Sequence, residues 1–154
     1  MEPAVIVSDI MTRNPRTVAP DTKLQEVASI MCLYRIPALP VVNNDGLLVG
    51  NISEMDILKK LFPTMEDIMS GNAVLEIERM TSNYSDSMNV LVKDMMTKNP
   101  VSVSPDSHIL KAAAKMTNHR FRRIPIADDE GKLVGVMSLG DIHKAIFQLH
   151  VSSV

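Results

Sequence analysis

The seven residues GNISEMD at positions 50–56 return 85 positions later as GVMSLGD at positions 135–141. At the same offset, residues 7–60 align with residues 92–145 without a gap, and 21 of the 54 aligned positions are identical. Identity at this level and at a fixed offset indicates two copies of one supersecondary unit. We call residues 50–56 the first motif and residues 135–141 the second motif.

Local sequence signals predict the same five strands and helices in each copy. A short extended piece bounded by prolines is followed by a helix, and two strands rich in β-branched residues flank a polar, glycine-containing turn. A second helix then begins at the serine of the motif. The expected order is therefore β-α-β-β-α, repeated from residue 102 to about residue 149. In the first copy the elements are expected at 17–19, from 21–22 onward, at 38–42, at 47–52 and from 53 to about 61.

The first helix of each copy shows a clear apolar face. Leu24, Val27, Ala28 and Met31 recur at the spacing of one helix face, so we expect them to be buried. Thr22 and Gln25 fit a capping box at the start of this helix. The second copy keeps the same face with Ile109, Ala112, Ala113 and Met116.

The repeats define a domain organisation of residues 7–61, residues 92–149 and a join at 62–91. About 55 residues bury too little surface to form a comfortable core alone. We therefore expect a mixed α/β (α+β) fold in which the two copies pack about a pseudo-two-fold axis. The join is expected to contain an inserted helix, because apolar residues recur in it every three or four positions: Ile77, Met80, Tyr84, Met88 and Leu91.

Composition narrows the classes of protein. Lys and Arg number 16 and Asp and Glu number 18, and this net charge of -2 argues against broad nucleic-acid binding. A single cysteine, Cys32, allows no intramolecular disulfide and favours a reducing compartment, the cytoplasm; we expect it to be buried or half-buried. The sequence has no membrane-length apolar run, signal peptide, metal-ligand spacing or nucleophile–base constellation, so neither an enzyme nor a membrane protein is expected.

Both copies contain motifs that resemble those of a known repeat family. The opening Asp-x-Met-Thr-x-Asn-Pro of both copies, followed by the strand, turn and motif, resembles the CBS domain, the cystathionine β-synthase type of repeat. Two such repeats in tandem resemble one CBS pair. The resemblance implies a regulatory module that binds an adenosine derivative, such as AMP, ADP, ATP or S-adenosylmethionine, in clefts between the repeats. It also implies a homodimer formed through the helices.

The family's ligand motif is Gly-h-x-Ser/Thr-x-x-Asp, where h is apolar, and both motifs match its polar positions. A serine hydroxyl can donate to a phosphate or ribose oxygen, and a carboxylate can accept from both ribose hydroxyls. Backbone N–H groups at the helix start are expected to favour phosphate. The same Ser-x-x-Asp pattern also fits a helix cap, and one side chain can serve both roles. The residues concerned are Ser53 and Asp56 in the first motif and Ser138 and Asp141 in the second.

The two copies are not equally equipped for an anionic ligand. Arg122 and Arg123 precede the strand before the second motif, where basic residues of the family commonly reach phosphates, although a solvated basic edge is the alternative. The corresponding residues, Pro37 and Ala38, carry no charge. Val136 is apolar and can lie against adenine, whereas its counterpart is Asn51. By resemblance, Ile36, Pro37 and Ala38 would complete the cleft beside Asp141.

Two functional hypotheses follow. The first is a sensor that binds an adenine nucleotide and signals its occupancy to a separate effector protein through differential binding. The alternative is a protein-interaction or assembly module whose ligand clefts are vestigial. The arginines could also bind the phosphates of an RNA. The chain has only five aromatic residues on which RNA bases could stack, and this disfavours an RNA-binding function.

Overall fold

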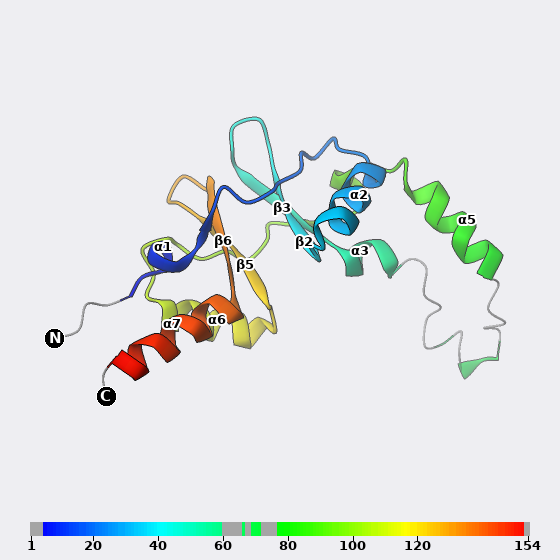
Figure 1. Ribbon diagram of the computed structural model, residues 1–154. Coiled ribbons are helices and arrows are strands. Elements are labelled where there is room, and N and C mark those ends of the chain that lie inside the picture. Colours follow the sequence, from blue (N-terminus) through cyan, green and yellow to red (C-terminus); the bar gives the residue numbers. More distant parts are fainter. Residues whose placement is uncertain (1–4, 60–65, 67–68, 72–76, 153–154) are drawn as a thin grey trace. The chain divides into compact units, whose positions relative to one another are not determined.

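The computed structural model describes residues 5–59, 66, 69–71 and 77–152. The chain forms two compact units (Figure 1). The C-terminal unit comprises residues 1–16, 45–48 and 101–154, and the central unit comprises residues 17–44 and 49–100. Each unit therefore contains chain from both repeats.

A three-stranded antiparallel sheet forms the base of the C-terminal unit. Its strand order is β1 (Thr12–Arg13), β6 (Leu133–Ser138) and β5 (Arg123–Ala127). Three helices accompany it: α1 (Val7–Ile10), α6 (Ile109–His119) and α7 (Leu139–Ser152).

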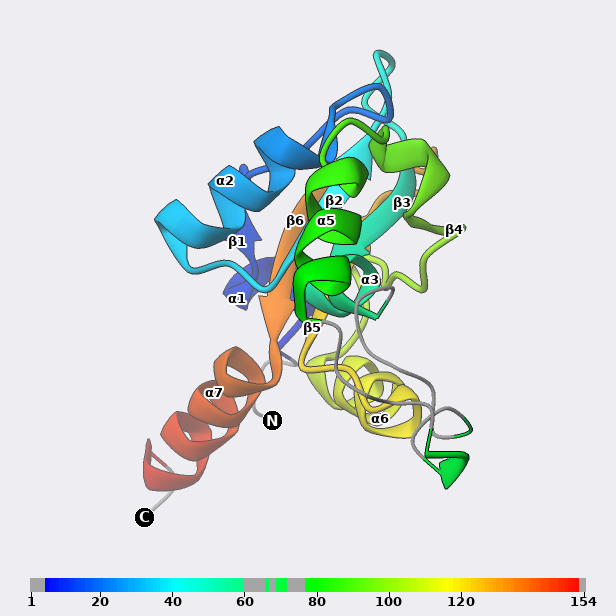
Figure 2. The same cartoon turned by 90° about the vertical axis from the view of Figure 1, so that its right-hand side faces the viewer.

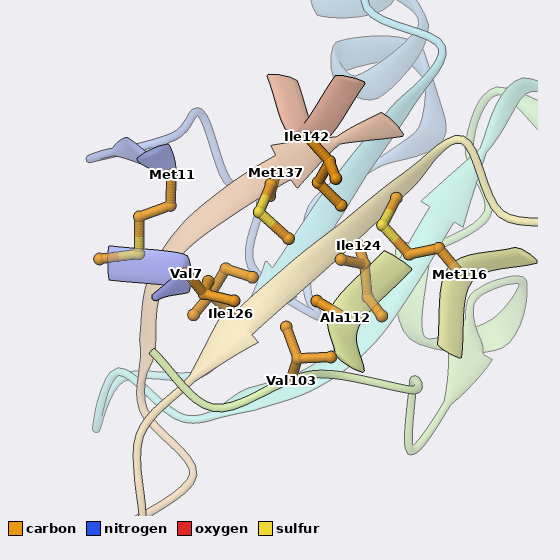
Figure 3. Packing of buried hydrophobic residues seen from close by; sticks show 9 residues of the cluster. All are labelled: Val7, Met11, Val103, Ala112, Met116, Ile124, Ile126, Met137 and Ile142. Atoms are coloured by element: carbon orange, nitrogen blue, oxygen red, sulfur yellow. The ribbon is translucent and has the colours of Figure 1, made fainter. Parts of the chain in front are cut away.

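Alternation along the strands separates a core face from an open face. Ile124, Ile126 and Met137 point into the core, where Figure 3 shows them among side chains from α1, α6 and α7. Arg123 and Val136 lie on the other face and keep more of their surface exposed. A strand has a side-chain period of two, so one face can be fully apolar while the other stays available for polar groups.

The central unit repeats this plan. Within the described residues its sheet has the order β2 (Ala38–Val42), β3 (Leu48–Ser53) and β4 (Thr97–Lys98). Figure 2 shows α5 in front of β2 and β3. The core combines buried residues of the sheet with those of the helices, and Tyr84 and Met88 pack against it. The helical elements are α2 (Leu24–Tyr34), α3 (Glu54–Leu58), α5 (Ile77–Ser87) and the 3-10 turn η1 (Val92–Asp94).

The opening segments of the two repeats are exchanged between the units. Strand β1 comes from the first repeat but pairs with β6 of the second, with Thr12 opposite Val136. Strand β4 comes from the second repeat but pairs with β3 of the first, with Thr97 opposite Asn51. Completing each sheet therefore requires residues that lie far away in the sequence, which local patterns do not reveal.

The turns of the two repeats also pair reciprocally. The N–H of Leu133 donates to the carbonyl of Gly46 at 3.1 Å, and the N–H of Leu48 donates to the carbonyl of Gly131 at 3.0 Å. These residues are equivalent under the 85-residue offset. Exchanging the two repeats therefore converts one of these hydrogen bonds into the other.

Most of the elements expected from the sequence are present. The strand at 38–42 and the inserted helix are confirmed, and the mixed α+β fold class is correct. The apolar helix faces are buried as expected except at Ala28 and Ala113, which are half-buried. The extended piece expected at 17–19 forms only an isolated bridge between Val18 and Val41. The strand expected at 47–52 lies one residue later. The second helix of the first copy begins after Ser53 as expected, but it ends at Leu58 with Lys59 as its C-cap, before the expected end at about Leu61. Residues 60 and 61 lie outside the described residues. So do residues 62–65, 67–68 and 72–76 of the join.

Two local predictions are wrong. Helix α2 has Lys23 as its N-cap without a side-chain hydrogen bond, so Thr22 and Gln25 form no capping box. The Thr22 hydroxyl instead accepts from the N–H of Ala19 at 3.1 Å and closes the preceding turn. Cys32 is exposed rather than buried, because the apolar face of α2 is centred on Leu24, Val27 and Met31.

Candidate ligand site

The second motif lies where β6 passes into α7. The N–H of Ser138 donates to Oδ2 of Asp141 at 3.0 Å, and the N–H of Asp141 donates to Oγ of Ser138 at 3.0 Å. This reciprocal pair is a capping box with aspartate in place of glutamate. The helix-cap function that the sequence left open is therefore present. Both side chains keep further capacity, because the hydroxyl can still donate and Oδ1 can still accept.

The two arginines lie beside this motif. Arg123 is the direct partner of Ser138 in the β5–β6 ladder, and the carbonyl of Arg122 accepts from the N–H of Leu139 at 2.9 Å. Both arginine side chains are exposed. In the part of the chain that the structure describes, neither guanidinium has an ion-pair partner. The structure thus places the backbone of two arginines with exposed side chains next to the Ser–Asp pair.

The open face of the sheet adds a residue that the sequence reasoning missed. Thr12 of β1 is exposed and lies directly opposite Val136, whose other neighbour across the sheet is Pro125. Directly opposed residues share a face, so Thr12, Val136 and Pro125 form one row. Val136 and Ser138 are two residues apart on β6 and share this face. The recurrence of Thr12 as Thr97 was the only available sequence signal, and it did not reveal the pairing with β6.

The first motif repeats the geometry without the charge. Ser53 donates its N–H to Oδ2 of Asp56 at 2.9 Å, and Asp56 donates its N–H to Oγ of Ser53 at 3.2 Å. The N–H of Glu54 donates to the carbonyl of Pro37 at 2.9 Å. Glu54 adds a second carboxylate to the first turn of α3, where the second motif has Leu139. Electrostatics at the first motif therefore disfavour an anion.

The expectation that unpaired helix N–H groups would cradle phosphate needs correction. In α7, the N–H of Leu139 is bonded to the carbonyl of Arg122, and that of Asp141 is bonded to Ser138. Among the described hydrogen bonds this leaves the N–H of Gly140 as the remaining donor of the first turn. The side chains, rather than an open row of backbone donors, therefore provide most of the polar capacity of this site.

The segment expected to complete the cleft belongs to the central unit. Ile36 packs against the core of that unit, Pro37 is exposed, and Ala38 begins β2. Their contribution to a site at Asp141 stays a prediction.

The described residues contain no group of three His, Cys, Asp or Glu side chains placed to hold a metal ion, and no described helix is long and apolar enough to span a membrane.

Two βαββα repeats, each with a Ser-x-x-Asp cap between its last strand and its last helix, define a tandem-repeat module. The family model for the CBS domain matches residues 7–63 and 92–148. The chain belongs to the CBS domain family, as a tandem pair of its repeats.

Two relatives and one solved structure are similar to this chain over more than nine-tenths of its length. An uncharacterized protein of Methanocaldococcus jannaschii is 32% identical over 154 residues, covering 92% of this chain and 91% of the relative. The chloroplastic CBS domain-containing protein CBSX2 of Arabidopsis thaliana is 27% identical over 157 residues, covering 93% of this chain but 64% of that protein. A crystal structure of CBSX2 in complex with AMP matches with a TM-score of 0.72 and 26% identity, covering 94% of this chain and 98% of that chain.

Proposed function

We propose that this chain is a regulatory module that binds an adenine nucleotide at the second motif and signals its occupancy to a separate effector protein. The observation that carries the proposal is the placement of Arg122 and Arg123 beside the capped Ser138–Asp141 pair. Asp141 can accept from a ribose diol while the guanidiniums hold phosphate. The AMP complex of CBSX2 supports this choice of ligand class.

In this proposal the chain senses and does not catalyse. Ligand binding favours one arrangement of the protein over another, and the effector responds to that shift. Val136 and Thr12 offer adenine an aliphatic surface with a hydroxyl beside it. The exposed thiol of Cys32 supports a reducing location such as the cytoplasm.

Thermal unfolding with AMP, ADP, ATP and S-adenosylmethionine tests the proposal. A ligand at a hundredfold excess over its dissociation constant adds about 2.7 kcal/mol of stability. For a chain of this size we expect the Tm to rise by about 5–10 °C. We expect AMP, ADP and ATP to raise the Tm more than S-adenosylmethionine does. Neither Arg122 nor Arg123 has an ion-pair partner in the described structure, so both can pair with phosphate. A Tm that no member changes would contradict the proposal.

The second candidate function is assembly alone, and exposed apolar side chains favour it. On α7, Phe147 is 60% exposed and Val151 is 53% exposed; on α2, Leu33 is 73% exposed. Surfaces of this kind mark protein contacts when they are contiguous. We propose that these helices form a homodimer interface, which is compatible with either function. Sedimentation tests the dimer, and the thermal unfolding panel separates the two functions, because assembly alone predicts a Tm that no nucleotide changes.

A further inference from the structure

The first and second motifs differ in the residue between the first helical residue and the aspartate. This residue is Met55 in the first motif and Gly140 in the second. Both motifs close with the same two reciprocal hydrogen bonds between serine and aspartate. The backbone around the two positions is therefore held in the same way, and the side chain is the difference.

Gly140 is not required by the fold of its unit. Its φ angle is not in the left-handed region, where glycine is favoured. Outside the neighbouring chain, the nearest atom that an added Cβ would meet is Oγ of Ser138 at 3.6 Å, an ordinary van der Waals distance. Glycine also weakens a helix relative to alanine. Neither backbone conformation nor packing in the C-terminal unit therefore explains a glycine here.

A side chain at position 140 would lie next to the Ser138 hydroxyl. A Cβ on residue 140 lies against the hydroxyl that we assign to the ligand. Because the first motif has the same cap geometry, the side chain of Met55 starts at the corresponding place beside Ser53. Met55 is 68% exposed, so its thioether chain extends into solvent rather than into the core. Its atoms beyond Cβ are therefore available to lie across the approach to the Ser53 hydroxyl.

We propose that this position determines which motif admits the ligand. Gly140 leaves the approach to the Ser138 hydroxyl open, and Met55 narrows the approach to the Ser53 hydroxyl. The ligand passes over the bare backbone of Gly140, in contact with it. This inference rests on the proposed nucleotide-binding function and adds a steric determinant to the charge difference between the motifs. Because the determinant is steric, it acts equally on a charged nucleotide and on its neutral nucleoside.

Calorimetric titration of the full chain with AMP and with adenosine tests the inference. We expect Gly140→Met to weaken both ligands by about tenfold or more, with a smaller effect for Gly140→Ala, because the added atoms occupy ligand space. The Tm without ligand should stay the same or rise in Gly140→Ala. Replacing Arg122 and Arg123 together is the matched charge control, and it should weaken AMP more than adenosine.

Met55→Gly is the reciprocal variant. We expect it to gain adenosine binding that a second change, Asp56→Asn, removes. If Gly140→Met binds both ligands as tightly as the unmodified chain, or loses only AMP, the steric inference is wrong while nucleotide binding stands. The same holds if Met55→Gly gains no adenosine binding. If the unmodified chain binds no member of the panel of AMP, ADP, ATP and S-adenosylmethionine, the proposed function itself fails, and the inference fails with it. If it binds another member in place of AMP, that member and adenosine are the ligand pair for the same variants.

Discussion

Asp141 shows how one side chain can be both a structural and a ligand-binding group. Its Oδ2 atom accepts the N–H of Ser138 and caps α7, whereas Oδ1 has no hydrogen bond among the described residues. Asp56 performs the same capping function at the first motif. The two aspartates are therefore matched in their structural role and differ in their surroundings, which makes each a control for the other.

Two arginines occupy a backbone conformation that favours glycine. Arg35 and Arg120 follow helices α2 and α6 with φ angles of 53° and 58°. A residue with a Cβ pays roughly 1–2 kcal/mol in this region, and glycine loses about 0.5–1 kcal/mol in backbone entropy. We therefore expect Arg120→Gly to raise the free energy of unfolding by about 0.5–1 kcal/mol, measured by urea denaturation.

The control for this variant is Arg120→Ala, which keeps the Cβ and removes the charge. It should leave the stability close to that of the unmodified chain. Equal stabilisation by glycine and alanine would show that relief of charge repulsion, and not of backbone strain, is responsible. A loss of stability in Arg120→Gly would contradict the strain argument directly.

Strand β1 is fixed to β6 by a close contact at a glycine. A Cβ added to Gly135 would lie 2.8 Å from Sδ of Met11 and 2.8 Å from the carbonyl oxygen of Thr12. The carbonyl belongs to the backbone of the paired strand and cannot move without separating the strands. We expect Gly135→Ala to lower the free energy of unfolding by about 1–3 kcal/mol, measured by chemical denaturation.

Gly50 is the matched position in the central unit. An added Cβ there would overlap the flexible side chain of Met96, while the carbonyl oxygen of Thr97 lies farther away at 3.1 Å. A methionine side chain can change its rotamer, so Gly50→Ala should cost less than Gly135→Ala. The reverse order would contradict our account of how the opening strands dock. These glycines are part of the motifs, but in the structure their space is filled by the chain itself.

The elements that sequence predicts well here are those with a local periodic signal. Leu24, Val27 and Met31 identify the buried face of α2 because helix geometry repeats every 3.6 residues. The start of the same helix differs from the prediction, because the Thr22 hydroxyl accepts the N–H of Ala19 and does not cap α2. Thr12 was missed as a neighbour of Val136, because pairing between distant strands leaves no local pattern. The spacing of Ser138 and Asp141 predicts a cap that is present, whereas the same spacing of Thr22 and Gln25 predicts a cap that does not form.

At the scale of the whole molecule, the exchanged opening segments join the stability of the two repeats. Val7 is fully buried in the core of the C-terminal unit although it belongs to the first repeat, and Val92 is fully buried in the central unit although it belongs to the second. We therefore expect the ligand-free chain to unfold in one transition, with calorimetric and van't Hoff enthalpies that agree.

Replacing Val7 with alanine extends this test. The change should lower the single Tm because it removes buried methyl groups from a core that the second repeat needs. Leu110→Ala, at a position on α6 that is 56% exposed, is the control and should change the Tm little. Two separate transitions, of which Val7→Ala lowers only one, would show that the units are thermodynamically independent.

The central claim is that the second motif, and not the first, binds an adenine nucleotide, and calorimetric titration of AMP into Asp141→Asn and Asp56→Asn tests it most directly. Asparagine keeps an oxygen for the helix cap but turns an amide donor toward the ribose diol, so stability is preserved and ligand recognition is lost. We expect Asp141→Asn to weaken AMP by about tenfold or more and Asp56→Asn to leave the affinity nearly unchanged. A larger loss in Asp56→Asn than in Asp141→Asn would contradict the account.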